Sequence, residues 1–443
     1  GSNNNNNCKT IYFVLNQSPN SLEPIIIENN SISFDNPNSG RTGIWIEQGN
    51  RDVIIHNCSF KYCYKSGGPG WASSIIADSF SSLHIGSCLF YDCGINEGGN
   101  VIYIGPSTGP TVVQNCTTFF TNNIYEKCGS GISTMNKEIS LIGNTYNKCA
   151  ANVILITHSI IVSDKFELIE NTFTGCSLGA IINFNGNNKG FSNMPIIQGN
   201  TFINNQPNSE LFVFRLENQL DHLELDNNTF DNQRSNLGGF GASITNINKE
   251  IELTFTNCYF INHHQQSNGG CIQTNDQQNG GNIKLNIFGC VFDNNKANGN
   301  GGAIYIESNG EVTIKYCTFS NNRVESDPVK LYDGGVIFIK HNTQPLSIIQ
   351  CDFINNQADC QKSLICPSLN EILIDSCNFV HSLDDGNDYS FIFIYMIENQ
   401  CQLNMNNCTF KLPSEDSSNK SPYILNSCTQ NIIINNCSIS NFH

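Results

Sequence analysis

The feature that most constrains the fold of this chain is a repeat of about 29 residues that runs along almost all of its 443 residues. Each copy carries an aromatic or apolar residue, here called the anchor, in a context such as NCSF, NTF or CVF. The anchors are Ile32, Phe60, Phe90, Thr118, Tyr146, Phe173, Phe202, Phe230, Phe260, Phe292, Phe319, Phe353, Phe379, Phe410 and Ile439. A period of this length is typical of a solenoid, in which each repeat is one unit that stacks on its neighbours.

Three positions before the anchor repeat together with it. The residue five before the anchor is apolar in every copy, and the residue seven before it is apolar in all copies but one. The residue two before the anchor is always Cys or Asn. The apolar alternation predicts a strand, and the extra residue before the Cys or Asn predicts a bend. We expect this Cys or Asn at a corner of the coil, where Asn tolerates a left-handed backbone and can bond the same amide one coil above.

A second polar bend follows the anchor, and small residues then lead into a third strand. In one copy the bend is Asn294-Asn295 after Phe292, and the strand is GAIYI from Gly302, where Gly permits a turn with positive φ. Each copy is therefore predicted to form one coil of three short strands, too thin to bury its own apolar residues. Coils stacked in register ~4.8 Å apart bury them in one continuous core.

The predicted fold is all-β: a right-handed parallel β-helix of about 15 coils, each of about 29 residues with three short strands. Residues 1–24 are predicted to form an N-terminal strand and loop, and residues 25–443 a single β-helix domain. Composition agrees, since 69 Asn and 36 Gly favour turns, and no window has a sustained helical period.

A family resemblance is carried by the stretch FDNNKANGNGGAIYI, residues 292–306, which joins F-x-x-N to GGAI. This pair of motifs resembles the repeats of polymorphic outer-membrane proteins, within the wider pectin-lyase-like group of right-handed parallel β-helices. It is recognisable again at residues 260–274 and 319–339 and is degenerate elsewhere. The resemblance implies a right-handed coil and a role on a cell surface, often adhesive, and transfers no catalytic residue.

Charge and cysteine content indicate which partners and which compartment to expect for this protein. The net charge of -16 and only five Arg argue against nucleic acid as a partner, which needs a basic stripe. The longest apolar run, FIFIYMI from Phe391, is too short to cross a bilayer. Twenty-one Cys indicate an oxidising compartment, and their odd number leaves at least one without a partner in the chain. We expect a secreted protein, outside the cell or on its surface.

Ten of the 21 Cys residues fall in the corner column, where Asn replaces Cys in the fifth to eighth copies. A metal or redox role does not explain that exchange, whereas a small, half-buried ladder residue does. Some neighbours in the column remain disulfide candidates, since stacked coils bring their Cα atoms within bonding range. Our preferred disulfides lie outside the column, each spanning about one coil: Cys63–Cys93, Cys149–Cys176 and Cys401–Cys428.

Eight Asn-x-Ser/Thr sequons agree with secretion. In four of them the neighbouring Cys and anchor face inward, so the Asn is expected to face outward where a glycosyltransferase can reach it: Asn57, Asn115, Asn407 and Asn436. The other four predicted glycosylation sites are Asn16, Asn29, Asn227 and Asn419.

An enzymatic role has one candidate pair. Glu224 and Asp226, beside His222, alternate outward on one strand. Side chains two residues apart on a strand lie roughly 6.5–7 Å apart, which is in the range of inverting glycosidases. A solvated strand face explains the pair more simply, so no catalytic residue is assigned.

Two further clusters were weighed as metal sites. Asp384, Asp385 and Asp388 have the oxygen ligands that Ca²⁺ prefers, but they also read as an acidic loop. His158 and the pair His263-His264 match no metal-ligand spacing. We expect no cofactor and no metal.

A structural or adhesive extracellular rod is therefore the first functional hypothesis, with cell-surface or matrix glycans and proteins as partners. The sequence has no helix to cover its terminal coils, so we also expect that the rod is a slice of a longer protein or that copies stack head to tail into a filament. The alternatives are a polysaccharide-binding or polysaccharide-degrading β-helix and a surface receptor.

Overall fold

The computed structural model of the chain describes its strands and corners. The described residues are 11–14, 23–34, 43–47, 51–63, 72–77, 80–94, 100–104, 117–134, 138–149, 154–157, 165–176, 182–185, 194–205, 214–216, 222–231, 234–235, 242–245, 251–265, 268–275, 282–307, 309–324, 334–339, 344–357, 364–365, 371–380, 390–394, 402–412, 423–427 and 431–441. They form two compact units, Gly1–Ile196 (unit 1) and Ile197–His443 (unit 2). The predicted division at residue 24 remains a prediction.

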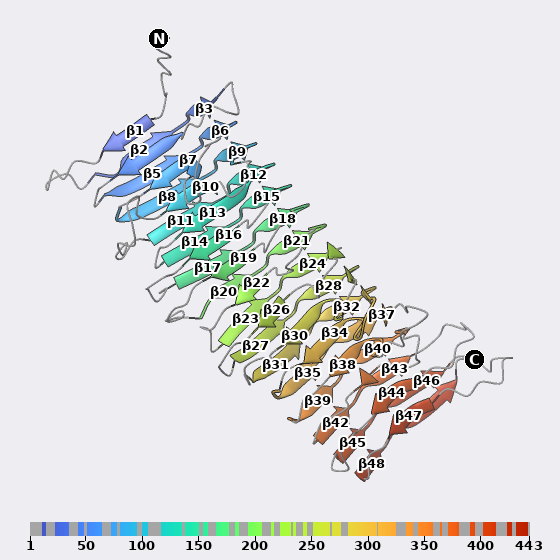
Figure 1. The fold of residues 1–443 in the computed structure, drawn as a ribbon. Helices are drawn as coiled ribbons and strands as arrows, with labels where there is room; N and C mark the ends of the chain where they lie inside the picture. The colour runs from blue at the N-terminus through green and yellow to red at the C-terminus, as the bar shows by residue number, and fades with distance from the viewer. Residues whose placement is uncertain are drawn as a thin grey trace. The chain divides into compact units, whose positions relative to one another are not determined.

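Unit 1 contains three parallel sheets, in which each strand pairs with its counterpart in the next coil (Figure 1). Sheet A consists of β1 (Ile11–Val14), β4 (Ile44–Glu47), β7 (Ala72–Ala77), β10 (Asn100–Ile104), β13 (Ser130–Thr134), β16 (Ile154–Thr157) and β19 (Ile182–Asn185). Sheet B consists of β2 (Ile25–Glu28), β5 (Asp52–His56), β8 (Ser82–Gly86), β11 (Thr117–Thr121), β14 (Glu138–Ile142) and β17 (Lys165–Ile169). Sheet C consists of β3 (Ser31–Ser33), β6 (Ser59–Lys61), β9 (Leu89–Tyr91), β12 (Ile124–Glu126), β15 (Thr145–Asn147) and β18 (Thr172–Thr174).

Unit 2 repeats the three sheets, and β20 (Ile196–Gln198) begins at the last residue of unit 1. Sheet A consists of β22 (Phe214–Leu216), β26 (Ala242–Thr245), β30 (Ile272–Asn275), β34 (Ile304–Glu307), β38 (Ile337–Ile339), β41 (Leu364–Ile365), β44 (Ser390–Ile394) and β47 (Tyr423–Ser427). Sheet B consists of β23 (His222–Asp226), β27 (Ile251–Thr256), β31 (Ile283–Phe288), β35 (Val312–Lys315), β39 (Leu346–Ile349), β42 (Glu371–Asp375), β45 (Gln402–Asn406) and β48 (Asn431–Asn435). Sheet C consists of β21 (Thr201–Ile203), β24 (Thr229–Asp231), β28 (Tyr259–Ile261), β32 (Val291–Asp293), β36 (Thr318–Ser320), β40 (Asp352–Ile354), β43 (Asn378–Val380), β46 (Thr409–Leu412) and β49 (Ser438–Asn441).

The predicted fold class is confirmed: the chain is an all-β parallel solenoid with about 29 residues per turn. The described residues contain no helix. Part of unit 2 goes beyond the predicted three strands per coil, because four two-residue strands form a short fourth sheet. These are β25 (Arg234–Ser235), β29 (His264–Gln265), β33 (Lys296–Ala297) and β37 (Arg323–Val324).

The anchors form continuous stacks of rings in the core. In unit 1, neighbouring rings from Phe60 to Phe173 have centroids 4.6–4.9 Å apart and planes within 6°. In unit 2, the rings from Phe260 to Phe410 have centroids 4.8–5.0 Å apart and planes within 9°. These separations follow the ~4.8 Å spacing of hydrogen-bonded strands. Each coil therefore adds one ring to the stack.

The fourth coil corrects the predicted repeat. Its anchor is Tyr125, which pairs with Phe90 before it and Tyr146 after it, whereas the sequence analysis assigned Thr118. Thr118 instead lies in sheet B, opposite Leu83. Anchor spacings of 35 and 21 residues thus replace two nearly equal ones. Loops outside the core vary in length without disturbing the stack, so even spacing was a poor guide here.

Each coil has two corners with the same local structure. At the first corner, the residue three before the anchor has positive φ, as in Asn57 (50°) and Asn257 (52°). At the second corner, the residue two after the anchor does so, as in Asn294 (54°) and Asn321 (56°). The sequence analysis predicted the left-handed backbone at the Cys or Asn two before the anchor, and this prediction is wrong by one residue, because the preceding residue adopts it. The Cys or Asn that follows it turns its side chain into the core instead.

The inward corner residues form ladders. At the first corner of unit 1, the backbone N–H of Asn144 donates to Oδ1 of Asn171 (2.9 Å), and Nδ2 of Asn144 donates to the carbonyl of Phe120 (2.8 Å). Asn295 and Asn322 repeat this arrangement at the second corner of unit 2. Because all four of these side chains are fully buried, the ladders satisfy backbone groups that the bend removes from the sheets.

The glycines of GGAI are explained by close packing between coils. Gly301 has φ of 75°, which favours glycine. A Cβ on Gly302 would overlap the carbonyl oxygen of Gly335 in the next coil. The motif therefore marks a place where the backbones of successive coils approach closely.

Candidate functional site

The outward side chains of sheet B in unit 2, here called the B face, form rows with one side chain per coil. The backbone register aligns His222, Glu252 and Lys284 in the first row. The second row contains Glu224, Thr254, Asn286 and Thr313, and the third contains Asp226, Thr256, Phe288 and Lys315. Because strand side chains alternate, the residues between them point into the core.

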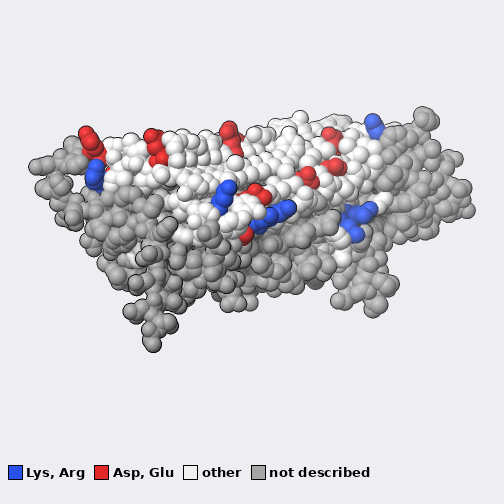
Figure 2. All heavy atoms as spheres, turned by 90° about the horizontal axis from the view of Figure 1, so that it is seen from above, with Lys and Arg blue, Asp and Glu red and all other residues white. Residues whose placement is uncertain are grey.

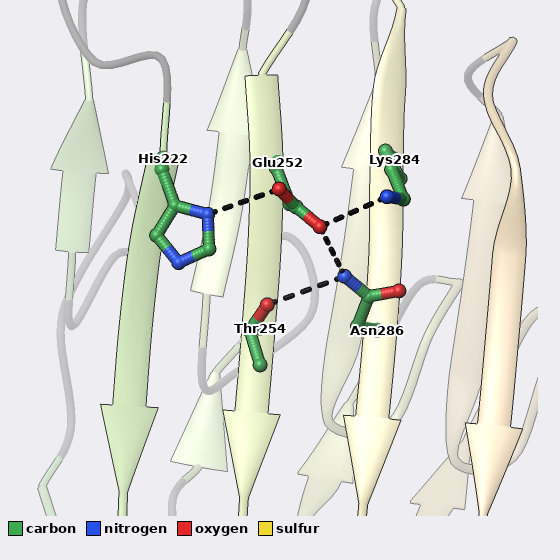
Figure 3. A network of polar contacts seen from close by, with 5 residues as sticks. All are labelled: His222, Glu252, Thr254, Lys284 and Asn286. Carbon is green, nitrogen blue, oxygen red and sulfur yellow. Dashed lines mark hydrogen bonds and ion pairs between the residues drawn. The ribbon is translucent and has the colours of Figure 1, made fainter.

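A polar network links three coils of the B face (Figure 3). Glu252 lies between Nδ1 of His222 (3.2 Å) and Nζ of Lys284 (3.1 Å). Asn286 donates through Nδ2 to Oε1 of Glu252 (2.7 Å) and to Oγ1 of Thr254 (3.3 Å). These bonds fix the partly exposed side chains of His222, Glu252 and Lys284 on the buried side chains of Thr254 and Asn286.

The charges in this network affect one another. Hydrogen bonding to Lys284 is the largest cause that lowers the pKa of Glu252 below its ordinary value. The hydrogen bonds from Asn286 and His222 act in the same direction, and desolvation opposes them. Glu252 is therefore ionised near neutral pH, and the network contains a fixed negative charge beside a fixed positive one.

The candidate carboxylates Glu224 and Asp226 lie on β23, in the second and third rows of the B face. Both are half-buried and point outward, as the alternation predicted. Thr256 donates through Oγ1 to Glu224 (3.5 Å), and Gln198 donates through Nε2 to Asp226 (2.9 Å). The arrangement presents two hydrogen-bonded carboxylates on one strand, and their role in catalysis stays untested.

The sequence analysis missed the first row of the B face. It named His222 only as a neighbour of Glu224 and Asp226, and did not align it with Glu252 and Lys284, which also stand eight before their anchors. An alignment of the residues eight before each anchor would have found the row. The signal was present in the repeat itself.

The predicted glycosylation sites that the structure describes are exposed, with positive φ, at the first corner: Asn29, Asn57, Asn227, Asn407 and Asn436. Nδ2 of Asn57 donates to Oδ1 of Asn29 one coil away (2.6 Å). Asn16, Asn115 and Asn419 lie outside the described residues. Glycosylation itself stays a prediction.

Four of the predicted disulfide cysteines are buried in the structure: Cys63, Cys93, Cys149 and Cys176. The Cys63–Cys93 and Cys149–Cys176 disulfides stay a prediction. Together with Cys128, these residues form a column at the second corner of unit 1, three residues after each anchor. Cys401 and Cys428 lie outside the described residues.

His263 occupies a ladder position rather than a metal site. Its backbone N–H donates to Oδ1 of Asn295 (3.0 Å), and its Nε2 lies 3.2 Å from the carbonyl oxygen of Phe230. Burial lowers its pKa to about 3, because the charged ring would lose its hydration, although the Phe230 carbonyl opposes this shift.

Neither a metal site of three or more ligands nor a membrane-spanning helix is found in the part of the chain that the structure describes. His158 and the acidic residues Asp384, Asp385 and Asp388 lie outside that part.

On the face shown in Figure 2, most of the described surface carries neither acidic nor basic side chains, and the charged ones occur in small groups.

Comparison with known families identifies one short match. Residues 289–307 match the Chlamydia polymorphic membrane protein repeat. The matched segment runs from the first-corner residue Gly289 through β32 and β33 to the end of β34, and it contains the stretch in which the sequence analysis found its resemblance. Comparison with curated proteins finds none that matches this chain.

The buried His263 predicts a pH dependence of stability. Unfolding raises its pKa from about 3 towards ~6.5, so the unfolded chain binds an extra proton between these values. Its contribution to stability is therefore complete above pH ~6.5 and declines as the pH falls towards 3. The variant His263→Asn retains a side chain that can hydrogen-bond in the ladder, but it has no imidazole to titrate. Between pH 7.5 and pH 4, wild type should lose about 3 kcal/mol more stability than this variant.

Urea denaturation at a series of pH values measures the difference. Asn295→His, placed in the same column one coil away, serves as the gain-of-function control and should acquire the additional loss. Parallel stability curves for wild type and His263→Asn would contradict the assignment.

Proposed function

We propose that this protein is a non-enzymatic structural or adhesive solenoid that acts outside the cell or on its surface, with glycans or proteins of cell surfaces and matrix as partners. The observation that supports it best is the B face, where outward polar and charged side chains of β23, β27, β31 and β35 stand in aligned rows. A binding surface gains affinity when its side chains are already ordered, and the network around Glu252 provides that order.

The match to the Chlamydia polymorphic membrane protein repeat supports the location. That name places the repeat in a membrane protein, and the resemblance implies an adhesive role at a cell surface. The 21 Cys and the exposed sequon Asn residues support passage through an oxidising, secretory compartment.

Binding of the intact protein to an array of surface and matrix glycans, and to fixed cells, tests the proposal. The combined variant Glu252→Ala, Lys284→Ala and Asn286→Ala should weaken binding at least about tenfold, since it removes several ordered contacts. Asp52→Ala with Ser82→Ala removes an outward hydrogen bond of unit 1 (2.7 Å) and is the matched control. Binding that is unaffected by the first variant, or no binding to any surface, would count against an adhesive B face.

The filament is the finer form of this proposal. The final coil of unit 2 exposes Ile432, Ile434 and Ile439 by 40–63%, at positions that earlier coils bury. A further coil, from more of the same chain or from another copy, would cover them. Negative-stain microscopy at rising protein concentration should show particles that lengthen by end-to-end addition. Particles of constant length would rule out self-stacking.

A polysaccharide-degrading enzyme is the second candidate, favoured by the outward pair Glu224 and Asp226. A depolymerisation screen over acidic and neutral polysaccharides tests it. If the pair is catalytic, Glu224→Gln should abolish the activity while leaving the circular dichroism spectrum unchanged. Activity that survives this substitution would assign the chemistry elsewhere.

A further inference from the structure

The short fourth sheet of unit 2 aligns basic residues from four successive coils. Its strand order is β25, β29, β33 and β37. The backbone register pairs Arg234 with His264. It then pairs His264 with Lys296, and Lys296 with Arg323. These four residues are here called the basic row. The chain has a net charge of -16 and only five Arg, two of which stand in this row. Neither the family match nor the B face accounts for it.

The basic row faces away from the core on the three strands whose side chains the structure describes. In β29, β33 and β37 the first residue is exposed or half-buried and the second is buried. His264 and Arg323 are exposed, and Lys296 is half-buried. Because paired strands lie ~4.8 Å apart, the row presents one basic side chain per coil at about that interval.

The backbone under the basic row is fixed by the second corner. The N–H of Lys296 donates to the carbonyl of His263 (2.9 Å), and the N–H of Arg323 donates to the carbonyl of Asn295 (2.8 Å). His263 and Asn295 are buried members of the corner ladder. The row is therefore placed on a rigid part of the coil, which lowers the entropy lost when a ligand binds.

The acidic side chains nearest to the row in the described chain lie before the second corner, at the end of sheet C. Asp231 accepts a hydrogen bond from Nδ2 of Asn262 (2.9 Å), and Asp293 accepts one from Nδ2 of Asn321 (3.0 Å). Both carboxylates are thus bonded to corner amides on their own side of the bend. Beyond the last strand, a single bridge continues the row to Gln357, which is neutral. Positive charge is therefore concentrated on the fourth sheet itself.

This arrangement suits a linear polymer with one negative charge per unit. Arg presents a planar fork that binds a carboxylate through two hydrogen bonds, and Lys adds a point charge. The interval of ~4.8 Å between coils is comparable to the length of one sugar residue in an extended chain. Distant acidic residues repel such a ligand only weakly, because the Debye length at physiological ionic strength is ~8 Å.

We propose that the basic row binds an acidic polysaccharide built of uronic acid residues, which lies along the fourth sheet and crosses successive coils. Carboxylates of neighbouring sugars pair with Lys296 and Arg323, and the ring of His264 hydrogen-bonds the next sugar. The inference rests on the proposed adhesive function. It names the class of glycan and assigns it to a surface separated from the B face by sheet C.

Binding of the full chain to immobilised polygalacturonate, measured at a series of salt concentrations, tests the proposal. Lys296→Gln with Arg323→Gln should weaken binding at least about tenfold, since two charge-assisted contacts are lost. The dependence of the dissociation constant on salt should also become shallower, because fewer counterions are released. An unchanged circular dichroism spectrum and melting temperature would show that the variant is folded.

The matched control is Lys148→Gln with Lys411→Gln, which removes the same charge from exposed positions outside the basic row and should bind like wild type. Polygalacturonate with methyl-esterified carboxyl groups keeps the sugar chain without its charges and should not bind. Heparin and single-stranded DNA serve as sulfated and phosphorylated competitors, and both should compete less well than free polygalacturonate.

Three results would overturn the proposal: no binding to polygalacturonate, equal binding by the two Lys/Arg variants, or stronger competition by heparin or DNA. Binding that is lost only in the B-face variant of Glu252, Lys284 and Asn286 would also overturn it, but it would leave the adhesive function intact. Binding to polygalacturonate through the basic row, without binding to any cell or matrix surface, would instead count against the adhesive function alone.

Discussion

The structure depends on the hydrogen bonds between successive coils. The strands of sheets A, B and C pair in parallel with the equivalent strand one turn away in their unit. The pairing is in register, as between β32, β36 and β40, and it shifts between β7 and β10. In-register pairing places equivalent residues on top of each other, so a single residue choice is repeated as a column. The ring stacks, the corner ladders and the rows of the B face all follow from this one constraint.

The corners show how such a chain turns without leaving backbone groups unpaired. A residue with positive φ makes the bend, and the next residue turns a small polar or sulfur-containing side chain inward. Asn bonds the coil above and the coil below, and Cys accepts the same backbone N–H through sulfur, as at Cys58 and Cys88 (3.4 Å). This equivalence explains why the two residues exchange along a column. It also explains why buried cysteines are numerous here, whatever their oxidation state.

The residue types of the outward side chains are less restricted than those of the inward ones, because outward side chains do not have to fit into the core. Sheet B of unit 2 uses this freedom to gather His222, Glu252, Lys284 and Asn286 into one network. Sheet B of unit 1 aligns Glu138 with Lys165 at the equivalent positions, and Glu167 bonds both Lys165 and Ser140 there. A solenoid thus separates the residues that maintain the fold from those available for recognition. For this reason we base the proposed function on the outward rows.

The sequence by itself determined the solenoid, its period, and most of the residues that fill the core, because each inward position must satisfy the same environment in every coil. It located Phe292, Phe319 and Phe353 in one stack correctly, since all three share the same local motif. The tertiary structure alone decided the register of the fourth coil at Tyr125 and the fourth short sheet. These features depend on how loops of unequal length bring neighbouring coils together, and no period in the sequence encodes that length.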